Sequence, residues 1–141
     1  MTISSAADIR SVFPEEGWFE ALREAVATDA ELAVIGRWCT LDLAVVIDEQ
    51  SVLLRLREGK IAEIVPDPDI GVSWSVTLRG TLKDWMTFLQ PVPPRFYSDL
   101  LAMNSRIPSF TIEGDRKMFV RHLHALSRIF RVAQQMGGGH A

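Results

Sequence analysis

The sequence predicts an α+β sandwich in which helices cover one face of a sheet of four or five strands. Two observations lead to this fold class. Hydrophobic residues recur at helical spacing near both ends of the chain, and they alternate with a period of two in between. The turns between the first three alternating segments are short, which favours antiparallel neighbours.

The N-terminal part of the chain is expected to be helical. A helix is predicted from Pro14 to about Asp29, because proline suits a first helical turn and apolar residues follow at helical spacing. A second short helix is expected over residues 30–38. The apolar positions of the first helix are Trp18, Phe19, Leu22 and Val26.

The middle of the chain is expected to form strands. Apolar and polar residues alternate from Thr40 onward, and the Glu58-Gly59-Lys60 turn separates two of the alternating segments. Pro66 and Pro68 end this meander, because proline cannot donate to a strand ladder. The clearest alternation follows these prolines and includes Trp74. The expected strands cover residues 40–47, 52–57, 61–65 and 72–78.

The C-terminal part is expected to contain three helices and a last strand. Residues Thr81 to Asp84 form a capping box that opens a helix over residues 81–90. A further helix is expected over residues 94–104 and a short strand over residues 110–113. Asp115 then caps the longest helix, which is expected to run to Met136.

That final helix separates into an apolar side and a basic stripe when successive residues are placed about 100° apart. The apolar side is expected to dock on the sheet. The stripe is either a solvated face or a docking surface for an anionic membrane or an acidic protein. It contains His124 and the four residues that would carry the docking: Lys117, Arg121, Arg128 and Arg131.

Composition limits the class of protein. The 141 residues are expected to form one domain over residues 13–136, with an N-terminal extension over 1–12 and a flexible tail over 137–141. Charged residues interrupt any signal-peptide core near the N-terminus, and a lone Cys39 forms no internal disulfide, so we expect a cytoplasmic protein. A net charge of −3 argues against nucleic acid as a partner.

The sequence offers little for catalysis or metal binding. His122 and His124 point to different sides of a helix and cannot share an ion. Asp115 and His122 are roughly 10 Å apart along a helix, too far to act as an acid/base pair. Cys39 is more often a small buried hydrophobe than a nucleophile. We therefore expect no enzyme, no metal site and no cofactor.

Apolar bulk is the main chemical feature of the second half of the chain. The plain interpretation is an ordinary core, and the functional one is a cavity for an apolar ligand, because Met and aromatic side chains line adaptable apolar sites. The residues expected to line it are Trp74, Trp85, Phe88, Phe96, Leu100, Met103, Phe110, Phe119 and Leu123.

Two segments carry a resemblance to a known family. Trp74-Ser75-Val76-Thr77-Leu78-Arg79-Gly80-Thr81 followed by Trp85, and Ile112-Glu113-Gly114-Asp115, resemble blocks of the sterol carrier protein 2 family. Residues 24–38 also resemble the lead-in to that family's first strand. The order of elements agrees over roughly residues 13–133.

The resemblance implies a mostly antiparallel, five-stranded sheet and overlying helices around a hydrophobic tunnel. Such a tunnel holds sterols, fatty acyl chains or fatty acyl-CoA, and no chemistry is done on them. The segment Asn104 to Pro108 departs from the Gly-containing turn that the family often has, which affects the expected shape of the tunnel mouth. The family's domain also occurs as an accessory module in larger enzymes, including alkylsulfatases.

Three function hypotheses follow. The first is a non-enzymatic binder or carrier of a lipid or other hydrophobic small molecule. The second is a protein-interaction or dimerisation module, forming a homodimer or acting as an accessory subunit of an enzyme on an apolar substrate. The third is a small cone-shaped enzyme, which ranks last because only His122 offers a titratable group on the core side.

Overall fold

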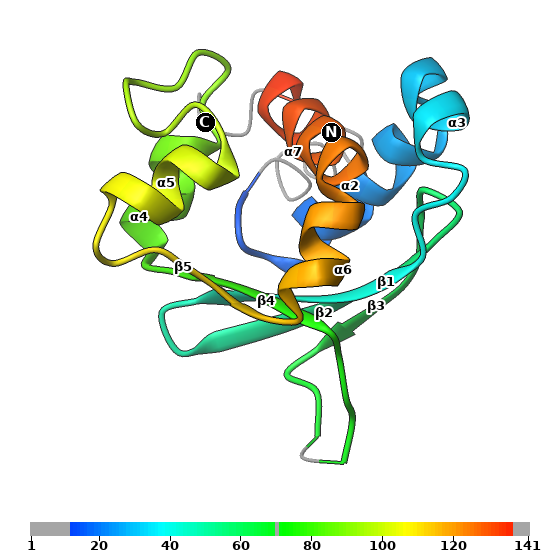
Figure 1. Cartoon of the computed structure of the whole chain (residues 1–141), viewed down its shortest axis with the longest axis horizontal. Coiled ribbons are helices and arrows are strands. Elements are labelled where there is room, and N and C mark those ends of the chain that lie inside the picture. Colours follow the sequence, from blue (N-terminus) through cyan, green and yellow to red (C-terminus); the bar gives the residue numbers. More distant parts are fainter. Residues whose placement is uncertain (1–11, 70, 137–141) are drawn as a thin grey trace, which may run out of the picture.

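A computed structural model describes residues 12–69 and 71–136, and its centre is a five-stranded sheet (Figure 1). The strand order is β3-β2-β1-β4-β5, so β1 lies in the middle. The sequence already places large apolar residues at alternate positions of β1 and β2, which therefore form the centre of the core. The strands are β1 (Leu41–Ile47), β2 (Gln50–Arg57), β3 (Lys60–Pro66), β4 (Val76–Gly80) and β5 (Thr111–Gly114).

The sheet is mostly antiparallel, as expected. β1 pairs antiparallel with β2, β2 with β3, and β4 with β5. The exception is β1 with β4, which run parallel in a register that sets Leu43 opposite Val76. A bulge between Arg55 and Leu56 shifts the pairing of β2 with β3.

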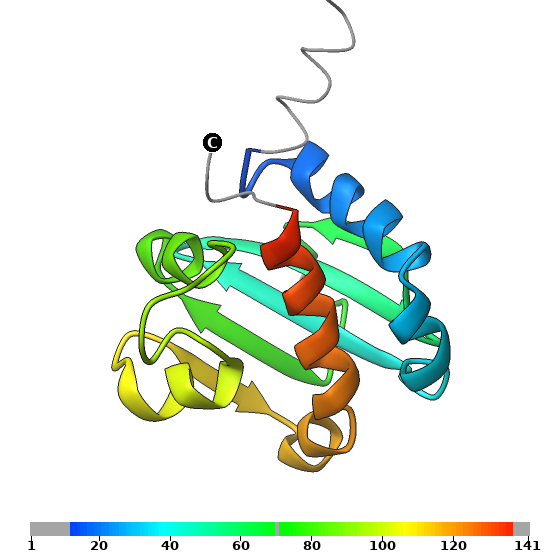
Figure 2. The same ribbon diagram turned by 90° about the horizontal axis from the view of Figure 1, so that it is seen from above.

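All helices of the described chain cover the same face of the sheet, which confirms the predicted layering (Figures 1 and 2). Seen from above, α7 runs across the middle, with α2 and α3 on one side of it and α4 and α5 on the other. No helix in these two ranges is long and apolar enough to cross a bilayer. The helices are α2 (Glu16–Ala27), α3 (Ala30–Ile35), α4 (Leu82–Phe88), α5 (Leu100–Arg106), α6 (Arg116–Arg121) and α7 (Leu123–Gln135).

Side-chain caps fix where several helices begin. Thr81 and Asp84 form both hydrogen bonds of the predicted capping box at α4. Asp115 accepts a hydrogen bond from the Met118 amide and caps α6 as expected. Asp99 does the same for α5, which starts at Leu100 rather than at the predicted residue 94. Asp99 has an extended backbone, and its carboxylate accepts a hydrogen bond from an amide in the first turn of the helix. It is therefore a better helix start than the proline-rich stretch before it.

Two further predicted elements differ from the structure. The expected helix over residues 115–136 is broken at His122 into α6 and α7. The break lets α6 pack on β4 while α7 packs on α2 and α3. The expected strand over residues 72–78 begins only at Val76, so Trp74 lies in the preceding loop. The predicted extension over residues 1–12 falls almost entirely, and the tail over 137–141 entirely, outside the described residues.

Candidate ligand site

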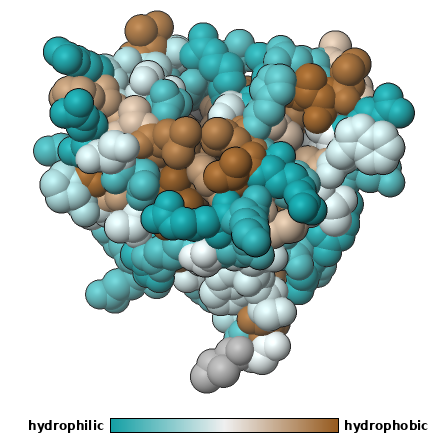
Figure 3. All heavy atoms as spheres, in the orientation of Figure 1, coloured by the Kyte–Doolittle hydropathy of each residue, from teal (hydrophilic) through white to brown (hydrophobic). Residues whose placement is uncertain are grey.

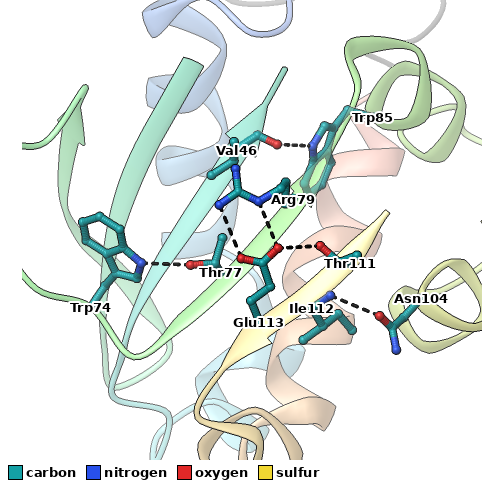
Figure 4. A network of polar contacts seen from close by, with 9 residues as sticks. All are labelled: Val46, Trp74, Thr77, Arg79, Trp85, Asn104, Thr111, Ile112 and Glu113. Carbon is teal, nitrogen blue, oxygen red and sulfur yellow. Dashed lines mark hydrogen bonds and ion pairs between the residues drawn. The ribbon is translucent and has the colours of Figure 1, made fainter. Parts of the chain in front are cut away.

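An aromatic cluster lies between the sheet and the helices, with Trp85 of α4 at its centre. The Trp85 ring lies 5.6 Å from Phe110, 5.9 Å from Phe130 and 6.1 Å from Phe88, measured between ring centroids. These separations are those of favourable tilted and edge-to-face aromatic pairs. Its indole nitrogen donates a 2.9 Å hydrogen bond to the Val46 carbonyl, so the ring is held in position against β1 (Figure 4).

Gly80 gives the cluster its room at the end of β4. A Cβ atom at this position would lie 2.9 Å from Phe110 Cδ1 and 3.4 Å from Trp85 Nε1. Any larger residue would therefore push against both rings. The Gly80-to-Trp85 spacing that carried the sequence resemblance thus has a packing reason in this chain.

The surface above this cluster is a seam between two pairs of helices, with α4 and α5 on one side and α6 and α7 on the other (Figure 2). We call this the helix seam. Figure 3 shows hydrophobic residues gathered in a hollow of the surface between α5 and helices α6 and α7. Half-buried hydrophobic residues pack against the core from both sides: Tyr97 and Ile107 from one, Met118 and Leu123 from the other.

Part of the seam forms a small cleft between the α4–α5 linker and α7. Its volume is about 120 Å³. Phe88, Leu100 and Phe130 form its apolar wall. Its polar side chains are Ser98, Asp99, Ser127, Arg131 and Gln134.

Two of these polar residues fasten α7 across the seam. Gln134 is buried, and its amide nitrogen donates a 2.9 Å hydrogen bond to the Phe88 carbonyl at the end of α4. Arg131 donates to the Pro91 carbonyl at 3.2 Å and to the Gln134 side chain at 3.1 Å. This end of the seam is thus held by polar contacts beside the packed rings of Phe88 and Phe130.

The structure brings most of the expected lining residues together beneath the helices. Leu123 is half-buried and packs against the core, whereas the half-buried Phe96 lies outside the core cluster. The guanidinium carbons of Arg95 and Arg106 lie over the Phe96 ring, 4.8 and 5.2 Å from its centroid. The fully buried ones are Trp85, Phe88, Leu100, Met103, Phe110 and Phe119.

Trp74 does not join this group. Its side chain is 39% exposed, and its indole nitrogen donates a 2.9 Å hydrogen bond to the Thr77 hydroxyl. Thr77 alternates with the core residues Val76 and Leu78, so it points to the sheet face that carries no helices. Figure 4 shows Trp74 beside this face.

A polar network on the same outer face was not anticipated from the sequence. Arg79 of β4 bonds to both carboxylate oxygens of Glu113 at 2.9 and 3.3 Å, and Thr111 donates to Glu113 at 2.7 Å (Figure 4). These hydrogen bonds, that of Arg79 first, lower the pKa of Glu113. The network links β4 to the edge strand β5. Alternation along both strands predicts only that these side chains point outward.

The buried cluster also contains residues outside the predicted lining set. Phe13 lies 4.8 Å from Trp18 and 6.3 Å from Trp85, so it joins α2 to the Trp85 group. Phe130 lies on the apolar side of the final helix, seven residues after Leu123, and that spacing was the available signal. Trp18 is 1% exposed, and its indole nitrogen has no hydrogen-bond partner in the part of the chain that the structure describes.

Burial favours the neutral forms of two titratable groups in the core. It raises the pKa of the Cys39 thiol to about 11, so the thiol stays protonated near neutral pH. Burial, with a smaller contribution from Arg121, lowers the pKa of His122. No group of three His, Cys, Asp or Glu residues able to hold a metal ion occurs within residues 12–69 and 71–136.

The predicted basic stripe is divided by the fold. Arg128 bonds to both carboxylate oxygens of Asp29 at 3.0 and 2.7 Å and lies 3.5 Å from Glu31, so it ties α7 to α3. Arg131 is engaged at the helix seam. Lys117 and Arg121 of α6 are exposed and form no side-chain hydrogen bond or ion pair with described residues.

Comparison with solved structures identifies the fold. A crystal structure of sterol carrier protein 2 matches with a TM-score of 0.68 and 14% identity over 85% of this chain and 95% of that one. A conserved hypothetical protein from Thermus thermophilus, described as possibly a sterol carrier protein, matches with a TM-score of 0.62 and 18% identity. That match covers 89% of this chain and 90% of the other.

A UbiJ-SCP2 ubiquinone synthesis protein matches with a TM-score of 0.56 and 14% identity, over 84% of this chain and 89% of that one. No protein-family profile and no curated protein matches the sequence. Backbone likeness at these identities speaks for the fold. The predicted fold family is thereby confirmed, and the chain has the sterol carrier protein 2 fold.

Proposed function

We propose that this protein binds and carries a lipid or other hydrophobic small molecule without transforming it. The ligand lies beneath the helix seam, against the aromatic cluster around Trp85. The observation that carries the proposal is the hydrophobic hollow at the seam (Figure 3), together with a cleft whose wall contains the buried rings of Phe88 and Phe130. The neighbour named sterol carrier protein 2 has the same fold, which supports an apolar ligand.

The small size of the cleft indicates that helices must move before such a ligand can enter. About 120 Å³ is well below the roughly 300–1,000 Å³ typical of small-molecule sites, so only one end of a lipid fits without rearrangement. The helices α4 and α5 contain seven residues each and are joined by a proline-rich linker. Their displacement from α7 would break the hydrogen bonds of Gln134 and Arg131 across the seam and would separate the Trp85 and Phe88 rings from Phe130.

The proposal includes no catalysis because neither of the two core groups with a burial-shifted pKa is positioned for proton transfer. The Cys39 thiol has a raised pKa and the His122 imidazole a lowered one, each because of burial. Neither group makes a side-chain hydrogen bond to a described carboxylate or hydroxyl that would orient it for proton transfer.

The first test is extraction of the purified protein with denaturing solvent, followed by mass spectrometry of the released molecules. A lipid or acyl chain close to one per protein supports the proposal. A protein that releases nothing, and that also fails to bind a fluorescent fatty acid, contradicts it.

A matched pair of substitutions on α7 locates the ligand. Ser127 is exposed and borders the cleft, so Ser127→Trp places a large ring in it without disturbing the core. His124 is exposed on the same helix and does not border the cleft, so His124→Trp is the control. We expect Ser127→Trp to weaken binding of a fluorescent fatty acid at least tenfold and His124→Trp to leave it unchanged. Equal affinities would place the ligand elsewhere.

A second candidate function is docking to a protein, as an accessory subunit or a homodimer. It is favoured by the surface at the end of α3, where Val34 is 65% exposed and Trp38 is 77% exposed. Exposed tryptophans are frequent anchors of interfaces. Light scattering tests it: self-association that Trp38→Ala abolishes, and that added lipid does not change, would favour this function.

A further inference from the structure

We propose that the exposed face of α6 docks the protein on anionic lipid bilayers, next to the opening through which the ligand passes. The α6 face consists of Arg116, Lys117, Val120 and Arg121, which together line an open stretch of surface. This inference rests on the proposed function for its biological meaning, although the docking itself is measured separately.

Helix geometry places these four residues together. Positions 116, 117, 120 and 121 fall within one side of a helix with 3.6 residues per turn. The other side carries Phe119, which is buried, and Met118, which is half-buried. The inward side therefore holds α6 on the protein, and the whole outward side is available to a partner.

The charges of the α6 face are not used by the fold. Arg116, Lys117 and Arg121 form no side-chain hydrogen bond or ion pair with any residue of the described ranges. The acidic residues nearest in sequence are occupied, since Asp115 caps α6 and Glu113 binds Arg79. Three cations without an ion-pair partner among the described residues thus form a local positive surface on one short helix, in a chain whose net charge is −3.

Val120 indicates which kind of partner fits the α6 face. It is 65% exposed and lies between the cations, where its apolar side chain is in contact with water. Basic residues around an exposed apolar one are the pattern of interfacial membrane contacts, in which lipid headgroups meet the cations and the apolar residue enters the headgroup boundary. The α6 face is also open rather than enclosed, a shape that suits contact with a broad bilayer better than insertion of a peptide.

The position of α6 connects this surface to the ligand. Figure 1 places α6 on the same face of the molecule as α5, and Figure 3 shows hydrophilic residues bordering the hydrophobic hollow on the α6 side. A bilayer that touches the α6 face would therefore lie beside the helix seam. An apolar molecule moving between membrane and cluster would then cross little water.

The test is sedimentation of the full chain with lipid vesicles. We expect binding to vesicles of phosphatidylcholine mixed with phosphatidylglycerol, weaker binding as salt rises, and little binding to pure phosphatidylcholine. The triple variant Arg116→Gln, Lys117→Gln and Arg121→Gln should lower the partition coefficient about 100-fold. Val120→Ser should lower it several-fold with no change in the salt dependence.

The matched control neutralises three exposed cations elsewhere: Arg37→Gln, Lys60→Gln and Lys83→Gln. It changes the net charge by the same amount and should leave most vesicle binding intact. The proposal is overturned if the wild-type chain ignores anionic vesicles, or if the control variant loses as much binding as the α6 variant.

A separate measurement keeps this proposal apart from the ligand proposal. Binding of a fluorescent fatty acid in vesicle-free solution should be the same for the wild-type chain and the α6 variant. Normal fatty-acid binding without vesicle binding would overturn the docking proposal alone. Vesicle binding without fatty-acid binding would overturn the ligand proposal and leave α6 as a membrane contact.

Discussion

Helices α6 and α7 come from one continuous amphipathic run, yet the fold uses their polar sides differently. In α7, Arg128 binds Asp29 of α3, and Arg131 binds the α4–α5 linker. In α6, the cations form no ion pair with residues 12–69 or 71–136, and Phe119 is the one residue of the helix that is buried. The comparison teaches that an amphipathic pattern predicts which side faces outward, whereas the neighbours decide whether the outward charges hold the fold together or stay available.

The largest expected effect is on the buried side of α7. Phe130 is 3% exposed and its ring lies 5.9 Å from Trp85 and 5.7 Å from Phe88. Phe130→Ala removes a packed ring and should lower the free energy of unfolding by about 3–5 kcal/mol in urea titration. A loss below about 1 kcal/mol would mean that the ring acts chiefly as a wall of the cleft and contributes little packing, and the contrast with α6 would then weaken.

The next effect is on the outward side of α7. Arg128 is 21% exposed and makes two hydrogen bonds to Asp29, so Arg128→Ala should cost about 1–2 kcal/mol of stability near neutral pH. The hydrogen bond from Arg128 lowers the pKa of Asp29. Its contribution is therefore complete above the unfolded-state pKa of about 4 and is lost as pH falls through the lower folded value.

Urea titrations from neutral to acid pH check this prediction. The wild-type chain should lose the Arg128 contribution on acidification, and the difference from Arg128→Ala should shrink. A difference that is the same at neutral and at acid pH would show that Arg128 acts through packing of its stem rather than through its charge.

A smaller effect is expected at His122, the residue at which the two helices meet. Its pKa is lowered by burial and by Arg121, so the unfolded chain takes up a proton first as pH falls below about 6.5. Stability should therefore decrease between that pH and the lower folded pKa, and then level off. His122→Gln should remove this part of the pH dependence, which stability measurements across the range would detect. An unchanged slope would assign it to another group.

The local parts of this fold could be predicted from sequence because neighbouring residues determine them. The Thr81–Asp84 capping box, the Asp115 cap and the alternation in β1 each depend on residues a few positions apart. The sequence predicts Trp85, Phe88 and Phe110 in the interior for the same reason, since each belongs to a recognisable apolar face, and all three are buried.

The missed features depend on distant residues. Arg128 and Asp29 are 99 positions apart, so the pattern of the final helix alone does not predict their contact. Arg128, which the basic stripe offers as a possible docking residue, instead links α7 to α3. Trp74 continued an alternating pattern, but the strand begins two residues later, and its indole nitrogen bonds to Thr77 on the outer face. No proline or glycine marks the break at His122 in the sequence. The break follows instead from the packing of α6 and α7 on different elements.

The smallest expected effect belongs to the α6 face. Val120 is 65% exposed, so Val120→Ala should change the free energy of unfolding by less than about 0.5 kcal/mol, with a slight gain because alanine favours helices. Thermal and urea unfolding compare it directly with Phe130→Ala. A clear destabilisation would mean that Val120 is covered by another part of the protein or by a second copy. An unchanged stability, combined with weaker binding to anionic vesicles, would separate the part of this amphipathic run that holds the fold from the part that contacts the membrane.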